Sequence, residues 1–288
     1  MNLLNEYSKI SEVAIRSPLS SFVNDEKITN EWAPLRFHAK PDLKKAIIEY
    51  NYFRSFLEED EIKIIELPSS DKLTLDSIYT RDSIVVCDSG LILCNMGRSS
   101  RTPEAEENFK ILEDNGYKIA GQIKSPGTLE GGDFIWIDNK NAAVGLGPRT
   151  NSEGIRQLKE ILGPEIDLHI VNLPDPDHPD DVLHLMSIIS PLDKDLAVIY
   201  KPFMPETFLN WLTKLGIEFV EVSEAEYPLM GCNILATAPR SIIMLENLPE
   251  IKDKLEKIGC KIRFYKGDEI SRKGEGGPTC LTRPLIRN

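Results

Sequence analysis

One unit of sequence pattern recurs five times along this chain and limits the folds that the chain can adopt. Each unit begins with apolar residues three and four positions apart, as in an amphipathic helix, and ends with a short apolar run typical of a strand. A glycine or turn usually separates the two, which suits the left-handed conformation in which many helices end. The five units are residues 46–68, 105–123, 152–174, 205–222 and 248–265.

Paired strand patterns lie between these units. Each pair has two apolar runs around a short polar or proline-containing turn, which is typical of a β-hairpin. Four pairs are continuous in sequence: residues 83–95, 133–147, 184–200 and 232–245. The fifth pair is split between residues 11–18 near the N-terminus and residues 279–288 at the C-terminus. The chain is therefore predicted to consist of five ββαβ modules, the last completed by both chain ends.

Five such modules predict an α/β-propeller with pseudo-five-fold symmetry, built as a single domain over residues 1–288. Radial repetition protects the edges of sheets, and a repeat of roughly 40–60 residues lies in the range of arrays and propellers. The alternative is a doubly wound α/β sheet. The phosphate-binding GxGxxG turn that would support that alternative does not follow any predicted strand.

The charge balance and the apolar runs limit the partners of the chain. Its formal net charge is −12 and its pI is about 5.0, which disfavours nucleic acid because affinity for the phosphate backbone depends on basic patches. No run of 18 apolar residues occurs, and the N-terminus lacks the basic and apolar regions of a secretory signal. We therefore expect a cytoplasmic protein that binds neither nucleic acid nor a membrane.

Cysteines are odd in number and show no CxxC spacing, so neither a disulfide framework nor a zinc site is predicted. Four of the five lie in strand-like runs and are predicted to be core thiols: Cys87, Cys94, Cys232 and Cys260. Cys280 differs because it follows the glycine-rich stretch 274–277. Glycines allow close approach of the backbone, so this thiol is the candidate for an accessible nucleophile.

Polar residues of four different kinds stand at the starts of four predicted hairpins: Asp82, Glu130, His184 and Cys280. In a five-fold arrangement these positions meet around the central axis, where a pocket would form. A thiolate is a competent nucleophile, a histidine can move its proton, and a carboxylate can orient that histidine. Taken singly, each residue also has a structural interpretation as a core, turn or capping residue. Their coincidence predicts a cysteine-dependent active site.

Five motifs resemble, in this order, those of the guanidino-group-modifying superfamily, which includes dimethylarginine dimethylaminohydrolase, arginine deiminase and the amidinotransferases. They are LDSIYTRD (75–82), GTLEGGD (127–133), PRTNSEG (148–154), LHLMS (183–187) and GGPTCLT (276–282). The resemblance extends from about residue 12 to residue 283. It implies a five-module α/β-propeller and a hydrolase that converts methylated arginine or arginine to citrulline without a cofactor or metal.

The resemblance also implies a role for each matched residue. Cys280 would attack the guanidinium carbon to form a covalent thiouronium, and His184 would protonate the departing amine and then activate water. Glu130 would hydrogen-bond the guanidinium, the histidine or both. Asp82 would bind the guanidinium nitrogens, since carboxylates can fix the plane of this resonance-stabilised group. Arg149 and Arg101 would hold the carboxylate of the substrate. Asp76 would be a further residue of the substrate pocket.

Two positions depart from the relatives and point in opposite directions. Dimethylarginine hydrolases tend to have Glu-Asp where this chain has Arg81-Asp82, which resembles arginine deiminases. Deiminases have a second aspartate where this chain has Met186. Loss of that carboxylate removes a charge-assisted hydrogen bond worth about 1.5–3 kcal/mol, and an apolar Met186 in the pocket would leave room for methyl groups. The second departure favours a dimethylarginine substrate.

Three alternatives share the same motifs: an arginine deiminase or dihydrolase, an amidinotransferase in which an amine replaces water, and a non-catalytic binding protein on the same fold. The acidic segment 175–181 matches no EF-hand or zinc pattern. We expect it to be a solvated loop before His184, which could serve as a lid over the site. The expected partners are a small guanidino substrate and a second copy of the chain, because relatives are often homodimers.

Overall fold

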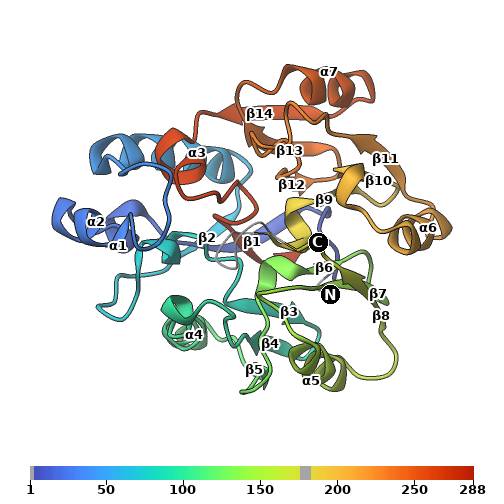
Figure 1. Cartoon of the computed structure of the whole chain (residues 1–288), viewed down its shortest axis with the longest axis horizontal. Helices are drawn as coiled ribbons and strands as arrows, with labels where there is room; N and C mark the ends of the chain where they lie inside the picture. Colours follow the sequence, from blue (N-terminus) through green and yellow to red (C-terminus); the bar gives the residue numbers. More distant parts are fainter. Residues whose placement is uncertain (1–2, 176–182) are drawn as a thin grey trace.

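The structure is a computed structural model that describes residues 3–175 and 183–288. Within this part of the chain the strands form five sheets of three strands each. Figure 1 shows the helices α3 to α7 toward the outside of the molecule and the strands toward the middle. The five sheets match the five predicted modules. Apart from Asp175, the acidic segment expected to be a loop or lid lies outside the described residues.

Four sheets have the predicted order of hairpin, helix and strand. The antiparallel hairpins pair β3 (Ile84–Cys87) with β4 (Gly90–Leu93), β6 (Phe134–Trp136) with β7 (Asn141–Leu146), β9 (Ile189–Asp193) with β10 (Leu196–Ile199), and β12 (Leu235–Ala238) with β13 (Ser241–Leu245). The second strand of each hairpin then pairs in parallel with β5 (Ile119–Gln122), β8 (Asp167–Asn172), β11 (Glu218–Glu221) or β14 (Lys261–Tyr265). The connecting helices are α4 (Glu104–Asp114), α5 (Ser152–Leu162), α6 (Glu206–Lys214) and α7 (Pro249–Lys257).

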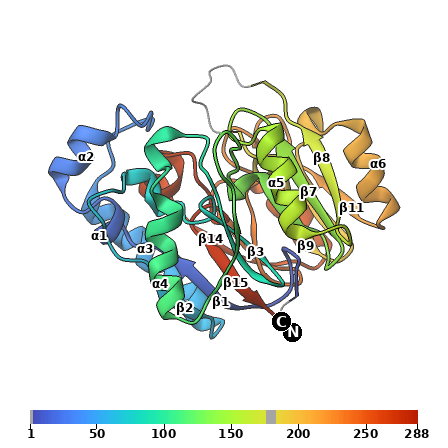
Figure 2. The same ribbon diagram turned by 90° about the horizontal axis from the view of Figure 1, so that it is seen from below.

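The fifth sheet joins the two ends of the chain. Its hairpin pairs β15 (Arg283–Arg287) antiparallel with β1 (Ile10–Ile15), and Figure 2 shows these two strands side by side. β1 also pairs in parallel with β2 (Lys63–Glu66). Three helices connect these two strands: α1 (Pro18–Ser21), α2 (Asp25–Glu31) and α3 (Leu43–Glu59). The predicted pairing of the N- and C-terminal segments is therefore confirmed.

Local sequence explains where the outer helices begin and end. At α5, the side chain of Asn151 accepts a hydrogen bond from the backbone N–H of Gly154 at 2.8 Å, which satisfies a donor that the helix cannot satisfy itself. The same helix ends at Gly163, whose φ of +84° is readily accessible only to glycine. Gly259 follows α7 with a φ of +85°, so the predicted glycine ends are present.

Burial distinguishes the strands at the two sides of each sheet. The first strands of the hairpins are almost wholly buried, whereas outer strands such as β5 and β11 have exposed residues at both ends and half-buried residues between them. A chain segment that leads into a first strand is therefore held near the middle of the molecule. The segments that carry Asp82, Glu130, His184 and Cys280 all do so.

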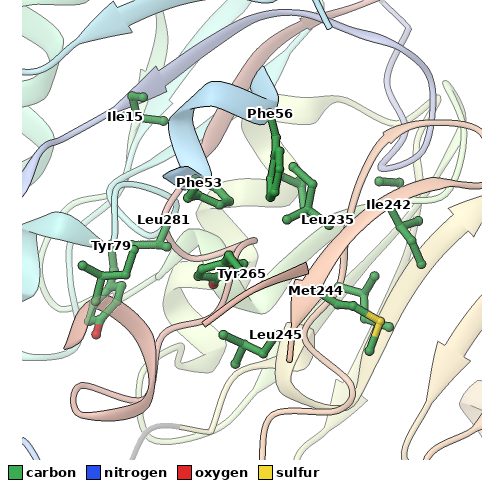
Figure 3. Packing of buried hydrophobic residues seen from close by; sticks show 14 of the residues in the cluster. Ile15, Phe53, Phe56, Tyr79, Leu235, Ile242, Met244, Leu245, Tyr265 and Leu281 are labelled. Carbon is green, nitrogen blue, oxygen red and sulfur yellow. The ribbon is translucent and has the colours of Figure 1, made fainter. Parts of the chain in front are cut away.

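The largest apolar cluster packs α3 against the sheet of β12, β13 and β14. Figure 3 shows Phe53 and Phe56 of α3 among Leu235, Met244 and Tyr265, and the rings of Phe53 and Tyr265 lie 5.1 Å apart. Leu281 belongs to the same cluster and is bonded to Cys280, so this core anchors the segment that carries the candidate nucleophile. In the described ranges, no helix is long and apolar enough to cross a membrane.

Phe53→Ala is expected to lower the free energy of unfolding by about 3–5 kcal/mol, because it opens a cavity in this core. Ile48→Ala is the matched control on the same helix: Ile48 is 69% exposed and Phe53 0%, so the control should change stability by less than about 0.5 kcal/mol. Urea unfolding followed by circular dichroism measures both. Equal losses would contradict the assignment of this cluster as the core.

Candidate active site

The four residues that the sequence analysis placed at hairpin starts converge in the structure. They precede β3, β6, β9 and β15. His184 Nε2 lies 2.7 Å from Glu130 Oε2, and His184 Nδ1 lies 3.8 Å from Asp82 Oδ1. Cys280, His184 and Asp82 line one small cavity. Residues almost 200 positions apart in sequence thus form a single site.

Glu130 and His184 form a buried charged pair. Burial disfavours the charge on His184, but the carboxylates of Asp82 and Asp133 and the hydrogen bond with Glu130 outweigh it and raise the pKa of His184 from 6.5 to about 9. Burial likewise favours neutral Glu130, yet its hydrogen bond with His184 and the charge of that ring hold the pKa of Glu130 well below its usual range. At neutral pH the pair is therefore an imidazolium that donates to a carboxylate.

Asp133, which the sequence analysis did not single out, supports this pair from behind. One of its carboxylate oxygens accepts from the backbone N–H of Leu185 at 3.0 Å and the other from the hydroxyl of Thr150 at 2.7 Å. The Thr150 hydroxyl oxygen also accepts from the backbone N–H of Glu130 at 3.1 Å. Burial raises the pKa of Asp133 to about 6. The same group of bonds therefore positions both members of the charged pair.

Gly132 explains the double glycine of the Glu130 motif. A Cβ atom at this position would lie 2.6 Å from both Asp82 Oδ1 and His184 Nδ1, much closer than real Cβ contacts. Only a residue without a side chain lets Asp82 and His184, which belong to two other modules, come this close to position 132. The motif is thus required by packing around the site.

One carboxylate oxygen of Asp82 is hydrogen-bonded to Arg101, and the other is directed toward His184. Its Oδ2 accepts from Arg101 Nη1 at 2.6 Å, while its buried Oδ1 has no hydrogen-bond partner among the described residues. A buried acceptor without a partner costs about 1–3 kcal/mol. A bound donor such as a guanidinium N–H would remove this cost, in agreement with the predicted role of Asp82.

Arg101 does not have the predicted freedom to hold a substrate carboxylate. Its guanidinium donates to Asp82, to the carbonyl of Tyr79 at 2.8 Å, and to both oxygens of Glu104 at 2.8 Å each. Each of its three nitrogens is therefore engaged. Arg101 lines the cavity and positions Asp82 through these bonds, and its expected contact with a substrate carboxylate stays a prediction.

Arg98 is a cavity residue that the sequence analysis missed, although it lies only three positions before Arg101. Its Nη1 is 3.0 Å from Asp76 Oδ2, and its side chain is 13% exposed. Its backbone N–H donates to Glu130 Oε1 at 3.0 Å. Arg149 is also at the cavity, with Nη1 3.5 Å from that same oxygen. Asp76, Arg98 and Arg149 are thus grouped on one wall.

Met186 is not where the specificity argument expected it. It is 3% exposed and belongs to an apolar cluster with Leu185, Ile188 and Leu212, and it is absent from the residues that line the cavity. Met186 follows His184 in a short 3₁₀ turn whose apolar side chains enter the core. The expectation that it makes room for methyl groups is therefore not supported by its position.

Cys280 is the one half-buried cysteine, and the other four are buried. Burial raises the pKa of its thiol, and the negative charge of Asp82 adds to this effect; hydrogen bonds from Asn233 and from the backbone of Gly277 oppose it. The resting thiol is therefore protonated at neutral pH. A cation bound beside Asp82 would favour the thiolate.

The glycines before Cys280 are required by close contacts with other modules. A Cβ atom at Gly274 or Gly276 would lie 2.1 Å from Tyr79, and one at Gly277 would lie 2.4 Å from Asn233. The backbone of the glycine-rich stretch thus packs directly against Tyr79 and Asn233. This contact, more than accessibility, explains its composition.

Two neighbouring cavities share Glu275 as a wall. The inner one, next to Cys280, has a free volume of about 20 Å³, which is room for about one water molecule. The outer one, lined by Asn233 and Ser187 among others, has about 280 Å³, close to the roughly 300 Å³ at which small-molecule sites begin. The inner cavity as it stands is smaller than a substrate the size of arginine.

Asp82, Glu130 and His184 could also serve as a metal donor set, because one ligand atom of each lies within 4.8 Å of the others. Imidazole binds a metal only in its neutral form. The raised pKa of His184 and its short bond to Glu130 favour the protonated ring instead. The arrangement is thus better suited to proton transfer than to metal binding.

Comparison with known proteins agrees with this fold and site. A family model described as N,N dimethylarginine dimethylhydrolase, eukaryotic, matches residues 23–287. The chain is 27% identical to uncharacterized protein YkgA of Bacillus subtilis, over 98% of this chain and 94% of that protein. It is 25% identical to N(G),N(G)-dimethylarginine dimethylaminohydrolase of Pseudomonas aeruginosa, over 84% of this chain and 89% of the enzyme.

Solved structures show the same fold at low identity. A dimethylarginine dimethylaminohydrolase mutant from Pseudomonas aeruginosa, in complex with citrulline, has a TM-score of 0.78 and 22% identity, covering 97% of this chain and all of that one. The amidinotransferase SxtG from Microseira wollei has a TM-score of 0.81 and 17% identity, covering 100% of this chain and 97% of that one.

Fold and site together define a protein of the guanidino-group-modifying superfamily. Its similarity extends both to hydrolases and to a transferase of that superfamily. Because the family model spans most of its length, this chain belongs to the N,N-dimethylarginine dimethylhydrolase family.

His184 predicts a pH dependence of stability. Its pKa is 6.5 when unfolded and about 9 when folded, so its contribution is complete below pH 6.5 and is lost as the pH rises toward 9. Urea unfolding at pH 6 to 9 should show a decline in wild type that His184→Gln reduces. The exposed His38→Gln is the control and should retain the decline. Identical slopes in wild type and His184→Gln would contradict the charged pair.

Proposed function

We propose that this chain is a hydrolase that cleaves a C–N bond of a guanidino compound derived from arginine, with Cys280 as nucleophile. The supporting observation is that Cys280, protonated His184 and Asp82 line one cavity, and that Asp82 Oδ1 has no hydrogen-bond partner within the part of the chain that the structure describes. These groups supply a nucleophile, a proton donor and an anchor for a cation. The family assignment supports the same reaction class.

The first half of the reaction forms a covalent intermediate. The substrate guanidinium binds with its N–H groups toward Asp82, and its positive charge favours release of the Cys280 proton to solvent. The sulfur attacks the guanidinium carbon and an S–C bond forms. The C–N bond to the leaving amine then breaks, and that nitrogen takes a proton from His184. The products of this half are a free amine and a thiouronium on Cys280.

Water completes the second half. His184, now neutral and still held by Glu130, removes a proton from a water molecule that attacks the thiouronium carbon. The C–S bond breaks with its electrons returning to the sulfur of Cys280, and the sulfur takes up the remaining hydroxyl proton to become a thiol again. The product is a urea group, which is citrulline when the substrate is an arginine derivative. His184 is protonated again, ready for the next cycle.

Charge balance supports a cationic substrate. The carboxylates around the cavity already have cationic partners: Asp82 with Arg101, Asp76 with Arg98, and Glu130 with His184 and Arg149. A guanidinium and a Cys280 thiolate would enter this set together as a pair with no net charge. Such a pair avoids the large penalty for an uncompensated buried charge.

The substrate we propose is an N-methylated arginine, which would yield citrulline and a methylamine. Support comes from the family match and from the dimethylarginine hydrolase of Pseudomonas aeruginosa, and no longer from Met186. Arginine itself is the alternative, given the similarity to arginine deiminases. We also propose that the five modules close into a propeller, act as one catalytic domain over residues 1–288, and work in the cytoplasm, where free cysteines persist.

The assay that tests this function offers purified protein asymmetric dimethylarginine and arginine in parallel and measures citrulline. We expect citrulline from dimethylarginine, and Cys280→Ser should reduce it to background because a hydroxyl is a far weaker nucleophile. Cys87→Ser is the matched control and should retain activity. Equal losses in both variants would reject Cys280 as nucleophile. Citrulline from arginine alone would indicate a deiminase, and turnover only with an added acceptor amine would indicate an amidinotransferase.

We propose that Arg98, which lines the cavity, binds the carboxylate of an amino-acid substrate. Arg98→Met is therefore expected to raise KM for an amino-acid guanidine by about 10- to 100-fold with a smaller change in kcat, because it removes a charge-assisted bond made equally in the ground and transition states. The same variant should have little effect on a guanidine that lacks the carboxylate. Arg101→Met should instead lower kcat for both substrates, since it releases Asp82. A carboxylate-independent loss in Arg98→Met would contradict its proposed contact.

A further inference from the structure

Each module of the fold places residues at the centre through the segment before its first strand. Asp82, Glu130, His184 and Cys280 occupy this segment in four of the five modules. The remaining module is the sheet of β12, β13 and β14. The segment before β12 carries Asn233, a residue that no motif of the sequence analysis included.

Asn233 reaches across to the module of Cys280. Its Oδ1 accepts two hydrogen bonds from Thr279, one from the backbone N–H at 3.1 Å and one from the hydroxyl at 2.7 Å. These two donors determine which end of the amide is the oxygen. The Nδ2 group is therefore the end that faces Cys280, and it donates to Sγ at 3.3 Å.

The absence of a side chain at Gly277 leaves room for the side chain of Asn233. A Cβ atom at Gly277 would lie 2.4 Å from Cγ and Oδ1 of Asn233. Asn233 is 7% exposed, so solvent does not replace its contacts. The glycine, the two bonds to Thr279 and the bond to sulfur together hold the amide in one orientation.

A donor at this point matters because the two largest influences on the sulfur oppose a negative charge, while the backbone of Gly277 and the side chain of Asn233 favour it. Burial and the carboxylate of Asp82 both favour the neutral thiol. The hydroxyl of Thr279 is 3.9 Å from Sγ, and its proton is committed to Asn233. An N–H that points at the sulfur stabilises the thiolate more than the thiol, since a thiol is a weak acceptor.

We propose that Asn233 is a further catalytic residue, whose side-chain amide holds the sulfur of Cys280 by a hydrogen bond and stabilises it in the thiolate form. This inference rests on the proposed role of Cys280 as nucleophile. It assigns to the fifth module the same kind of contribution that the other four make. The guanidinium of the substrate and the amide of Asn233 then act on the same sulfur.

The test measures the rate at which iodoacetamide alkylates Cys280 between pH 6 and 11, with the modified peptide identified by mass spectrometry. In Asn233→Leu the midpoint of this profile should rise by about one pH unit, which means about tenfold slower alkylation below the midpoint. Asn233→Asp keeps an acceptor for Thr279 but places a carboxylate beside the sulfur, so its midpoint should rise at least as far. Asn210→Leu, on the exposed face of α6, is the matched control.

The outcomes of this alkylation experiment distinguish a role of Asn233 in stabilising the thiolate from a purely structural role. A raised midpoint in Asn233→Leu, with melting temperature retained, supports the inference. If Asn233→Leu fails to fold, an unchanged midpoint in Asn233→Asp, which lacks the donor, overturns it. A change in the maximum alkylation rate with an unchanged midpoint would show that Asn233 only holds the segment of Cys280 in position. That result would overturn the inference. Because alkylation needs no substrate, a shifted midpoint in a protein that turns over no guanidine would reject the proposed function alone. Turnover by wild type with unshifted midpoints would reject the role of Asn233 alone.

Discussion

The buried charges at the centre of this protein must balance one another, and the rest of the site depends on that balance. Arg101 is bound between Glu104 and Asp82, and Glu130 joins His184 to Arg149. Removal of one member of such a set leaves a charge unpaired, which typically costs about 3–5 kcal/mol. The same balance keeps His184 protonated while Cys280 is neutral, and so prepares the site for a cation.

The modular fold makes this arrangement possible. Buried first strands bring their preceding segments to the middle, and each segment supplies a different functional group. The close approach then depends on missing side chains: Gly132 admits His184 and Asp82, and Gly277 admits Asn233. Glycine is therefore as much a part of the site as the reactive residues.

Several residues near the reactive centre act by holding others in place. Asp133 connects the turn after His184 to Thr150 and so to the backbone of Glu130. Arg101 orients Asp82 and leaves the other oxygen of that carboxylate without a hydrogen-bond partner among the described residues. Such supporting contacts explain why reactive residues can be held within short distances of each other without ordering by a ligand.

The sequence by itself determined the five modules, the pairing of the chain ends, and four of the residues that meet at the centre. These follow from local periodicity, from turn chemistry and from motifs whose residue types belong together. Only the tertiary structure decided the partners of each side chain. It shows Arg101 bound to Glu104, Asp82 and the carbonyl of Tyr79, Arg98 at the cavity, and Met186 in the core. It also shows Asn233 beside the sulfur, because a contact between modules depends on distances that no spacing along the chain can express.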